Sequence, residues 1–298
     1  MKALPPLPPS VTLHSPADGL AQLQVRHPAC EADLYLQGAH LTRFQQRNKL
    51  PLLFVSASSA FAHGKPIRGG VPIIFPWFGA LDGQPAAPMH GFARTSPWTL
   101  TAASEDATSV RITLELTPAD VAPEKRAFWP HAFVLRLHLH LSSTLQMDLE
   151  VENLSDSPFL FEEALHTYLH IADVQCADVR GLESHSYIDK TDHLRIKTHG
   201  VDPLRIVSET DRVFTGATGT CILTDPVLAR RILVKKEHSR TTVVWNPWVA
   251  KAAAMADFGD HEWPGMICIE TANTAPDAIT LASGGRHTMH TLIEEAPL

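Results

Sequence analysis

The stretch FVLRLHLHLSSTLQMDLEVEN covers residues 133–153 and decides how the rest of the chain is interpreted. In 133–142 and in 145–153, apolar and polar residues alternate, as they do in half-buried β-strands. A strand of this kind buries one face and exposes the other. The same alternation recurs in residues 23–28, 32–37, 109–116, 230–237, 241–246, 266–271 and 287–295.

The segments between these strands predict an all-β fold. Turn-forming sequences such as Pro-Ala-Asp-Gly at 16–19 and Ser-Gly-Gly at 283–285 separate the alternating stretches. The 23 prolines leave little room for long helices, and no strand–helix–strand rhythm is present. We therefore expect a large antiparallel β-sandwich with few short helices, formed by one domain over 18–298 after a flexible N-terminal segment at 1–17.

The charge and the cysteines narrow the class of protein. A formal net charge of −7 argues against a nucleic-acid partner, although two well-placed arginines can still bind one small phosphate. The start MKALPPLPPS does not resemble a secretory signal, and no apolar run is as long as a membrane span. The four cysteines are scattered without a CxxC pair, which suits buried thiols in a reducing compartment. We expect a cytoplasmic protein.

His138 and His140 are the one pair of residues that suggests a metal. They stand two apart on an expected strand, so both side chains share a face with Arg136. Two such histidines could begin a zinc site. The spacing assigns no third ligand, and with 17 histidines in the chain such pairs arise by chance. A solvated sheet face is the preferred interpretation, and no metal or other cofactor is predicted.

Four stretches break the alternation and concentrate unusual residues. They are GKPIRGGVPIIFPWFG (64–79), HGFAR (90–94), EEALHTYLHI (162–171) and CIETAN (268–273). A glycine pair allows the backbone to approach a ligand, while prolines and aromatic residues stiffen the surrounding loop.

Read together, these stretches resemble one family. IRGGVPIIFPWFG, HGFARTSPW, ALHTYLHI, ETDRVF (209–214), VVWNPW (243–248) and ICIETAN occur in the order found in the hexose-6-phosphate mutarotases (glucose-6-phosphate 1-epimerases), a branch of the aldose 1-epimerases. The similarity runs from about residue 18 to the C-terminus. It implies a sandwich of the galactose-mutarotase type with an active-site groove on one concave sheet face.

The resemblance also implies roles for individual residues. The histidine of ALHTY and the glutamate of ETAN are the family's catalytic pair, which corresponds to His166 and Glu270. The arginines of RGG and HGFAR, here Arg68 and Arg94, contact the substrate, chiefly its phosphate. The aspartate of ETDR, here Asp211, contacts sugar hydroxyls. Some members carry a substrate-contacting glutamine where this chain has Met89, which puts one hydroxyl contact in doubt.

Each of these residues also has a plainer interpretation. On sequence alone, His166 is as well explained as a satisfied core histidine, whereas Glu270 stands in a strand where an unpaired charge is costly. The two arginines could instead pair with nearby carboxylates, and Asp211 could cap a turn. His90 either supports the substrate near C1 or fixes the Gly91 turn. Apolar faces for the sugar could come from Trp77, Phe78 and Trp248.

The chemistry of anomer exchange suits this set of residues. Opening a cyclic hemiacetal needs one proton delivered to the ring oxygen and one removed from the C1 hydroxyl, which a histidine and a carboxylate can do without a cofactor. We therefore expect a monomeric isomerase acting on a hexose 6-phosphate. The alternatives are a mutarotase for unphosphorylated aldoses and a non-catalytic carbohydrate-binding protein on the same fold.

Overall fold

Two eight-stranded antiparallel sheets form most of the structure. The computed structural model describes residues 4–298. The first sheet, which we call the β20 sheet, contains in spatial order β15 (Arg195–Thr198), β14 (Ser186–Asp189), β16 (Thr210–Phe214), β19 (Thr241–Asn246), β20 (Met266–Asn273), β11 (Glu163–Leu165) and β5 (Ile73–Ile74), with β12 (Tyr168–His170) also paired to β20.

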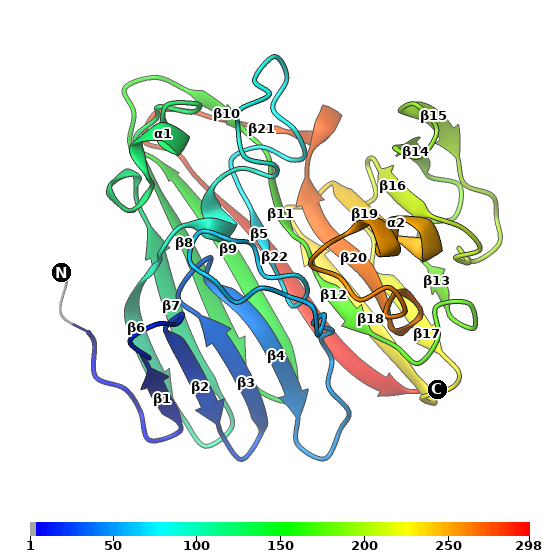
Figure 1. Ribbon diagram of the computed structural model, residues 1–298, viewed down its shortest axis with the longest axis horizontal. Coiled ribbons are helices and arrows are strands. Elements are labelled where there is room, and N and C mark those ends of the chain that lie inside the picture. The colour runs from blue at the N-terminus through cyan, green and yellow to red at the C-terminus, as the bar shows by residue number, and fades with distance from the viewer. Residues whose placement is uncertain (1–3) are drawn as a thin grey trace.

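The second eight-stranded sheet, which we call the β9 sheet, joins distant parts of the chain. Its spatial order is β13 (Asp178–Arg180), β17 (Cys221–Asp225), β18 (Arg230–Glu237), β22 (Arg286–Pro297), β9 (Leu145–Asn153), β8 (Phe133–Leu141), β7 (Val110–Leu116) and β6 (Thr99–Glu105). Figure 1 shows β22, in red, running between the green β9 and the yellow β18.

The remaining elements are short. A four-stranded sheet contains β1 (Val11–His14), β2 (Gln22–Arg26), β3 (Cys30–Tyr35) and β4 (His40–Gln46), and β10 (Phe159–Phe161) pairs with β21 (Ile279–Leu281). The helices are α1 (Pro123–Arg126) and α2 (Trp248–Ala254), with 3-10 turns η1 (Ala93–Thr95), η2 (Pro118–Asp120), η3 (Trp263–Gly265) and η4 (Ala275–Asp277). The prediction of an all-β fold with few short helices is confirmed.

The N-terminal segment differs in part from the expectation. Residues 11–14 lie in the stretch expected to be flexible, yet they form β1 and pair with β2 in register Val11↔Val25 to His14↔Gln22. Buried Val11 fixes this strand, since its side chain joins the main hydrophobic core. The division of the chain at residue 17 stays a prediction.

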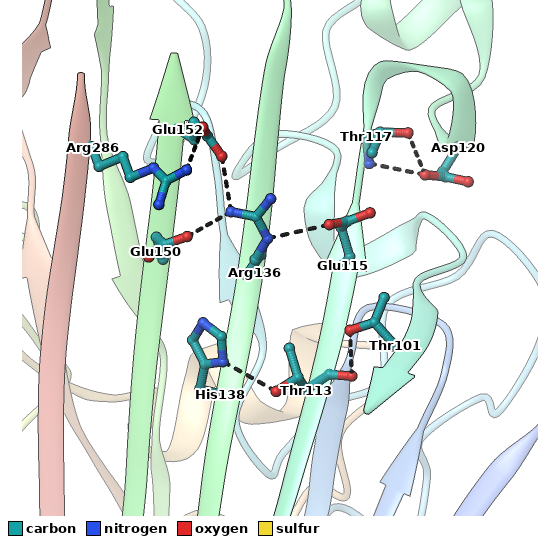
Figure 2. Close-up of polar contacts among 10 residues, drawn as sticks. All are labelled: Thr101, Thr113, Glu115, Thr117, Asp120, Arg136, His138, Glu150, Glu152 and Arg286. Carbon is teal, nitrogen blue, oxygen red and sulfur yellow. Dashed lines mark hydrogen bonds and ion pairs between the residues drawn. The ribbon is translucent and has the colours of Figure 1, made fainter. Parts of the chain in front are cut away.

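The β9 sheet shows why alternation was a reliable signal. In β9, Leu145, Met147, Leu149 and Val151 are buried, and the polar residues between them are partly exposed. On the exposed face, Arg136 of β8 bonds Glu115, Glu150 and Glu152 (Figure 2). His138 lies on the same face, with its Nδ1 3.1 Å from the Thr113 hydroxyl. Among residues 4–298, no group of three or more His, Cys, Asp or Glu side chains is arranged to hold a metal ion.

The β20 sheet is covered on both faces. Every residue of β19 and of β20 is buried. One face, with Val244, Ile267 and Ile269, packs into the main core between the sheets. The opposite face carries Trp245 and Cys268, which pack with Ala252 of α2 in a smaller cluster. In Figure 1, α2 accordingly lies beside β19 and β20.

The four cysteines differ in their exposure. Cys30, Cys221 and Cys268 are buried free thiols as expected, whereas Cys176 is exposed because it lies in a turn. No helix within residues 4–298 has the length and apolar character needed to cross a membrane.

Candidate active site

A cavity of about 290 Å³ opens on the face of the β20 sheet that carries Trp245. Both polar and apolar side chains line it, and they come from strands, loops and α2. The lining residues are Arg68, Phe78, Met89, His90, His166, Lys190, Asp211, Trp245, Lys251, Met255 and Glu270.

Strand register brings the acidic residues to this cavity. Asp211 of β16 lies opposite Trp245 of β19, and Trp245 lies opposite Cys268 of β20. Directly opposed residues share a sheet face, and so do residues two apart on one strand. Glu270, two residues after Cys268, therefore points to the same side as Asp211.

A break between two strands places His166 beside Glu270. β11 and β12 both pair with β20, and the chain leaves the ladder between them at His166 and Thr167. There the His166 amide donates to the Pro72 carbonyl, 3.0 Å away. His166 Nδ1 lies 3.4 Å from Glu270 Oε1. The imidazole is stacked on Tyr168, with ring centroids 4.9 Å apart and planes 11° from parallel.

The electrostatics of the pair follow from its burial. Side-chain exposure is 10% for His166 and 1% for Glu270. Burial, reinforced by the positive charges of Arg94 and Arg68, lowers the pKa of His166 well below its ordinary value. Burial, reinforced by the negative charge of Asp211, raises the pKa of Glu270 well above its ordinary value. Both groups are thereby driven toward their neutral forms.

Asp211 is subject to the same effect. Burial raises the pKa of its carboxyl, although Lys190 and Lys251 act in the opposite direction. Its side chain faces the cavity and does not lie in a turn. The capping role considered from the sequence does not apply.

Arg68 is held firmly in the cavity wall. Its Nε and Nη2 donate to Asp257 Oδ2 over 3.2 and 3.1 Å, and its Nη1 donates to the Tyr168 hydroxyl over 3.2 Å. Burial lowers the pKa of this guanidinium, but Tyr168 and Asp257 raise it by more, so the charge is secure. The carboxylate partner considered from the sequence is therefore present, and the side chain still lines the cavity.

Arg94 is not among the side chains that line the cavity, but it bonds the backbone of Met89, which is. Its Nη2 donates to the carbonyl of Met89 over 2.8 Å. Burial lowers its pKa to about 10, which still leaves it charged at neutral pH. Met89 itself is 52% exposed and lines the cavity. Its thioether is a weak acceptor and no donor, so it cannot replace the hydrogen bonds of a glutamine amide.

His90 serves the turn and the cavity at once. Its backbone N–H donates to the Gly79 carbonyl over 2.7 Å, and its Nδ1 accepts the Gly79 N–H over 3.2 Å. Accepting at Nδ1 leaves the ring proton on Nε2. Burial, together with Arg94 and His166, lowers the pKa of this histidine, so it is a neutral hydrogen-bond donor. Both roles left open by the sequence are compatible with this position.

The glycines of the two loops have a different purpose from the one expected. Gly70 has φ +62, and a Cβ there would overlap the Leu41 carbonyl. Gly91 has φ +71, and a Cβ there would overlap the Phe75 carbonyl. These glycines therefore allow protein backbones to approach each other closely, which fixes the loops that carry Arg68 and His90.

Trp77, like Arg94, is a predicted site residue that is not among the side chains lining the cavity. It is only 4% exposed, its indole N–H donates to the Pro88 carbonyl over 2.9 Å, and its ring packs edge-on against Phe92 in the core. Its neighbour Phe78 lines the cavity instead. Trp248 packs on Trp263 with centroids 4.3 Å apart. The expectation that Trp77 contacts substrate is corrected accordingly.

Lys190 and Lys251 line the cavity, and reasoning from sequence did not identify them. Lys190 directly follows β14, and its Nζ lies 4.9 Å from the centroid of the Phe78 ring. Lys251 of α2 forms an ion pair with Glu209 over 2.9 Å. Neither lysine stands in a distinctive sequence pattern, and both reach the cavity only through tertiary packing.

Comparison with known proteins gives consistent results. The sequence model of the aldose 1-epimerase family matches residues 21–294. A protein of Escherichia coli strain K12 named "Putative glucose-6-phosphate 1-epimerase" is 37% identical over 257 residues, 86% of this chain and 84% of its own. A crystal structure of a "putative mutarotase" from Salmonella typhimurium is 31% identical, with a TM-score of 0.90 over 99% of this chain and 97% of that one.

A more distant structure supports the expected architecture. A "galactose mutarotase-like protein" from Clostridium acetobutylicum is 13% identical and superposes with a TM-score of 0.73 over 97% of this chain and 98% of that one. At this identity the likeness concerns the fold alone. The prediction of a galactose-mutarotase-like sandwich is confirmed.

Proposed function

Because the chain belongs to the aldose 1-epimerase family, we propose that it interconverts the α and β anomers of a hexose 6-phosphate, with glucose 6-phosphate as the first candidate. The observation that carries this proposal is the buried contact of 3.4 Å between His166 Nδ1 and Glu270 Oε1 in a cavity walled by cationic side chains. The names of the relatives at 34–37% identity point to the same substrate.

The two pKa shifts suit the two proton transfers of ring opening. Burial favours the neutral forms of both groups, and one proton moved from Glu270 to His166 across their 3.4 Å contact gives the reacting ions. His166 has a lowered pKa, which makes its protonated form a strong acid toward the ring oxygen. Glu270 has a raised pKa, which makes its carboxylate a strong base toward the C1 hydroxyl. As the C1–O5 bond breaks, O5 gains the proton of His166 and Glu270 gains the proton of O1. Rotation about C1–C2 and the reverse transfers close the other anomer.

The remaining cavity residues favour binding over chemistry. Asp211 and the Nε2–H of His90 offer hydrogen bonds to hydroxyl groups, and Trp245 and Phe78 offer apolar surface to the C–H side of a sugar. Arg68 and Arg94 place two positive charges beside the reacting pair, and both act on the pKa of His166. A guanidinium can bind a phosphate through two parallel hydrogen bonds. The expected monomeric state and cytoplasmic location stay predictions.

Magnetisation-transfer NMR on glucose 6-phosphate tests this proposal directly. We expect the purified protein to accelerate exchange between the α and β signals, and to act less on free glucose at equal concentration. His166→Asn keeps a planar polar side chain without a titrating group, and we expect it to remove the acceleration. Exchange at the spontaneous rate with the wild-type protein would refute the proposed activity.

A further inference from the structure

The positive charges around the cavity are not equally available to a ligand. Arg68 is bonded to Asp257 and Tyr168. Lys251 is paired with Glu209. Arg94 already donates to a backbone carbonyl. In contrast, the Lys190 ammonium takes part in no ion pair or side-chain hydrogen bond among residues 4–298, and it lies over the Phe78 ring.

Lys190 is nevertheless held in a defined place. Its backbone N–H donates to the Asp211 carbonyl over 2.9 Å, which ties the end of β14 to β16 beside the cavity. Its ammonium stands 4.9 Å from the centre of the Phe78 ring, a cation–π distance. An ammonium that is positioned but not neutralised is ready to bind an anion.

The loop under the ammonium is fixed as well. Glu162 Oε2 accepts the Phe78 N–H over 2.8 Å. Its other oxygen accepts the Thr274 hydroxyl over 2.7 Å and the Ala275 N–H over 2.6 Å. Glu162 thereby connects Phe78 to the residues that follow β20, the strand that carries Glu270. The ring that contacts Lys190 and the strand of the catalytic glutamate are therefore held by the same carboxylate.

We propose that Lys190 determines the preference of this site for a phosphorylated sugar, by binding the phosphate dianion through its otherwise unpaired ammonium. This inference rests on the proposed function, because it assigns a specificity role within the same cavity. It also assigns different roles to the cationic side chains. Arg68, whose charge is balanced by Asp257, shapes the wall and the local field, while Lys190 supplies the charge that a neutral sugar cannot use.

Binding measurements on Lys190→Met test this assignment, with Lys251→Met as the matched control from the same cavity wall. Isothermal titration with glucose 6-phosphate should show an affinity about 10- to 100-fold lower for Lys190→Met, the range expected when a charged hydrogen bond is lost. The loss of affinity for Lys251→Met should stay below about fivefold, since that ammonium already forms an exposed ion pair with Glu209. Lys190→Arg should retain most of the affinity.

The same variants separate this inference from the proposed function. Titration with free glucose should change little in Lys190→Met, so that selectivity falls while sugar binding persists. Equal losses for both sugars, equal losses in the two lysine variants, or no binding of glucose 6-phosphate to the wild type would overturn the role of Lys190. A wild type that binds glucose 6-phosphate in a Lys190-dependent way but does not exchange its anomers would overturn the proposed activity alone.

Discussion

The β9 sheet and the β20 sheet differ in the burial and hydrogen bonding of their charged side chains. Arg136 of β8 meets one carboxylate of β7 and two of β9 on a face that stays partly exposed (Figure 2). On β20, Glu270 is 1% exposed and its Oε2 has no hydrogen-bond partner among the described residues. The first arrangement satisfies its charges, whereas the second leaves a carboxyl group in an unfavourable environment. A buried and poorly satisfied acid is the kind of feature that function, not stability, explains.

The largest expected contrast between the sheets is catalytic. Glu270→Gln should lower the rate of anomer exchange about 10²- to 10⁴-fold, the usual contribution of one positioned proton-transfer group. Glu150→Gln on β9 should leave the rate unchanged, because Glu150 faces away from the cavity on the other sheet. Adding His166→Asn to Glu270→Gln should cost little more, since the two groups act as a unit. A fully additive double variant would contradict a paired mechanism.

The second contrast concerns backbone packing. Gly91 and Gly284 have nearly equal φ values of +71 and +68, but a Cβ at Gly284 would meet open space. Gly284→Ala should lower the free energy of unfolding by about 1–2 kcal/mol through backbone strain. Gly91→Ala should lower the free energy of unfolding by about 1–3 kcal/mol more than Gly284→Ala does, because its methyl group overlaps the Phe75 carbonyl.

Denaturant unfolding measures this difference, and the rate of exchange shows whether His90 has moved with the loop. Equal losses of stability at the two glycines would mean that the site loop tolerates displacement.

The third contrast concerns the effect of a carboxylate on stability, which is expected to have opposite signs at Glu270 and at Glu150. A carboxyl with a raised pKa in the fold destabilises the protein once the pH exceeds its unfolded value, near 4.5 for glutamate. Glu270→Gln should therefore raise the free energy of unfolding at neutral pH by about 1–3 kcal/mol, the usual penalty for an unsatisfied buried group. The gain should vanish below pH 4.5. Thermal unfolding between pH 4 and pH 8 tests it, with Glu150→Gln expected to destabilise instead. A pH-independent gain would rule out relief of the buried charge.

The smallest expected effect is on the exposed face of the β9 sheet. Arg136→Met should reduce stability by about 1 kcal/mol at low salt, and less at high salt, since the pairs are partly solvated. Hydrogen bonds from Arg286 and Arg136 lower the pKa of Glu152, so this stabilisation is present at neutral pH and is lost as the pH falls through the lowered pKa. The gap between variant and wild type should thus narrow in acid, as urea titrations would show. A gap that widens in acid would contradict this account.

The two sheets also differ in how well the sequence predicts them. The bounds expected for β9, β18 and β19 match the structure. In β9 and β18 the burial of one face leaves a clear alternation in the sequence. β14, β15 and β16 were not predicted, since they are four or five residues long and carry mixed polar residues. Their place in the β20 sheet depends on pairing across the chain.

The site was only partly predictable for the same reason. The contact of His166 with Glu270 arises where the chain leaves the ladder between β11 and β12, and no local pattern marks that point. The resemblance to a family supplied those residues. The prediction that Trp77 contacts the substrate was wrong, because successive residues of the loop point in different directions and Phe78, not Trp77, faces the cavity. Lys190 was missed because a lysine in a turn is ordinarily a solvent-exposed residue.

The position of β22 has a consequence for how the protein is made. This strand, Arg286–Pro297, lies in space between β9 and β18, although it follows both along the chain. During synthesis, β6 to β9 can pair with their sequence neighbours as they emerge, and so can β17 and β18. The two halves of that sheet are joined only after residues 286–297 have been translated. Until then the strands β9 and β18 lack their final partner, and unpaired strand edges of this kind are prone to aggregation.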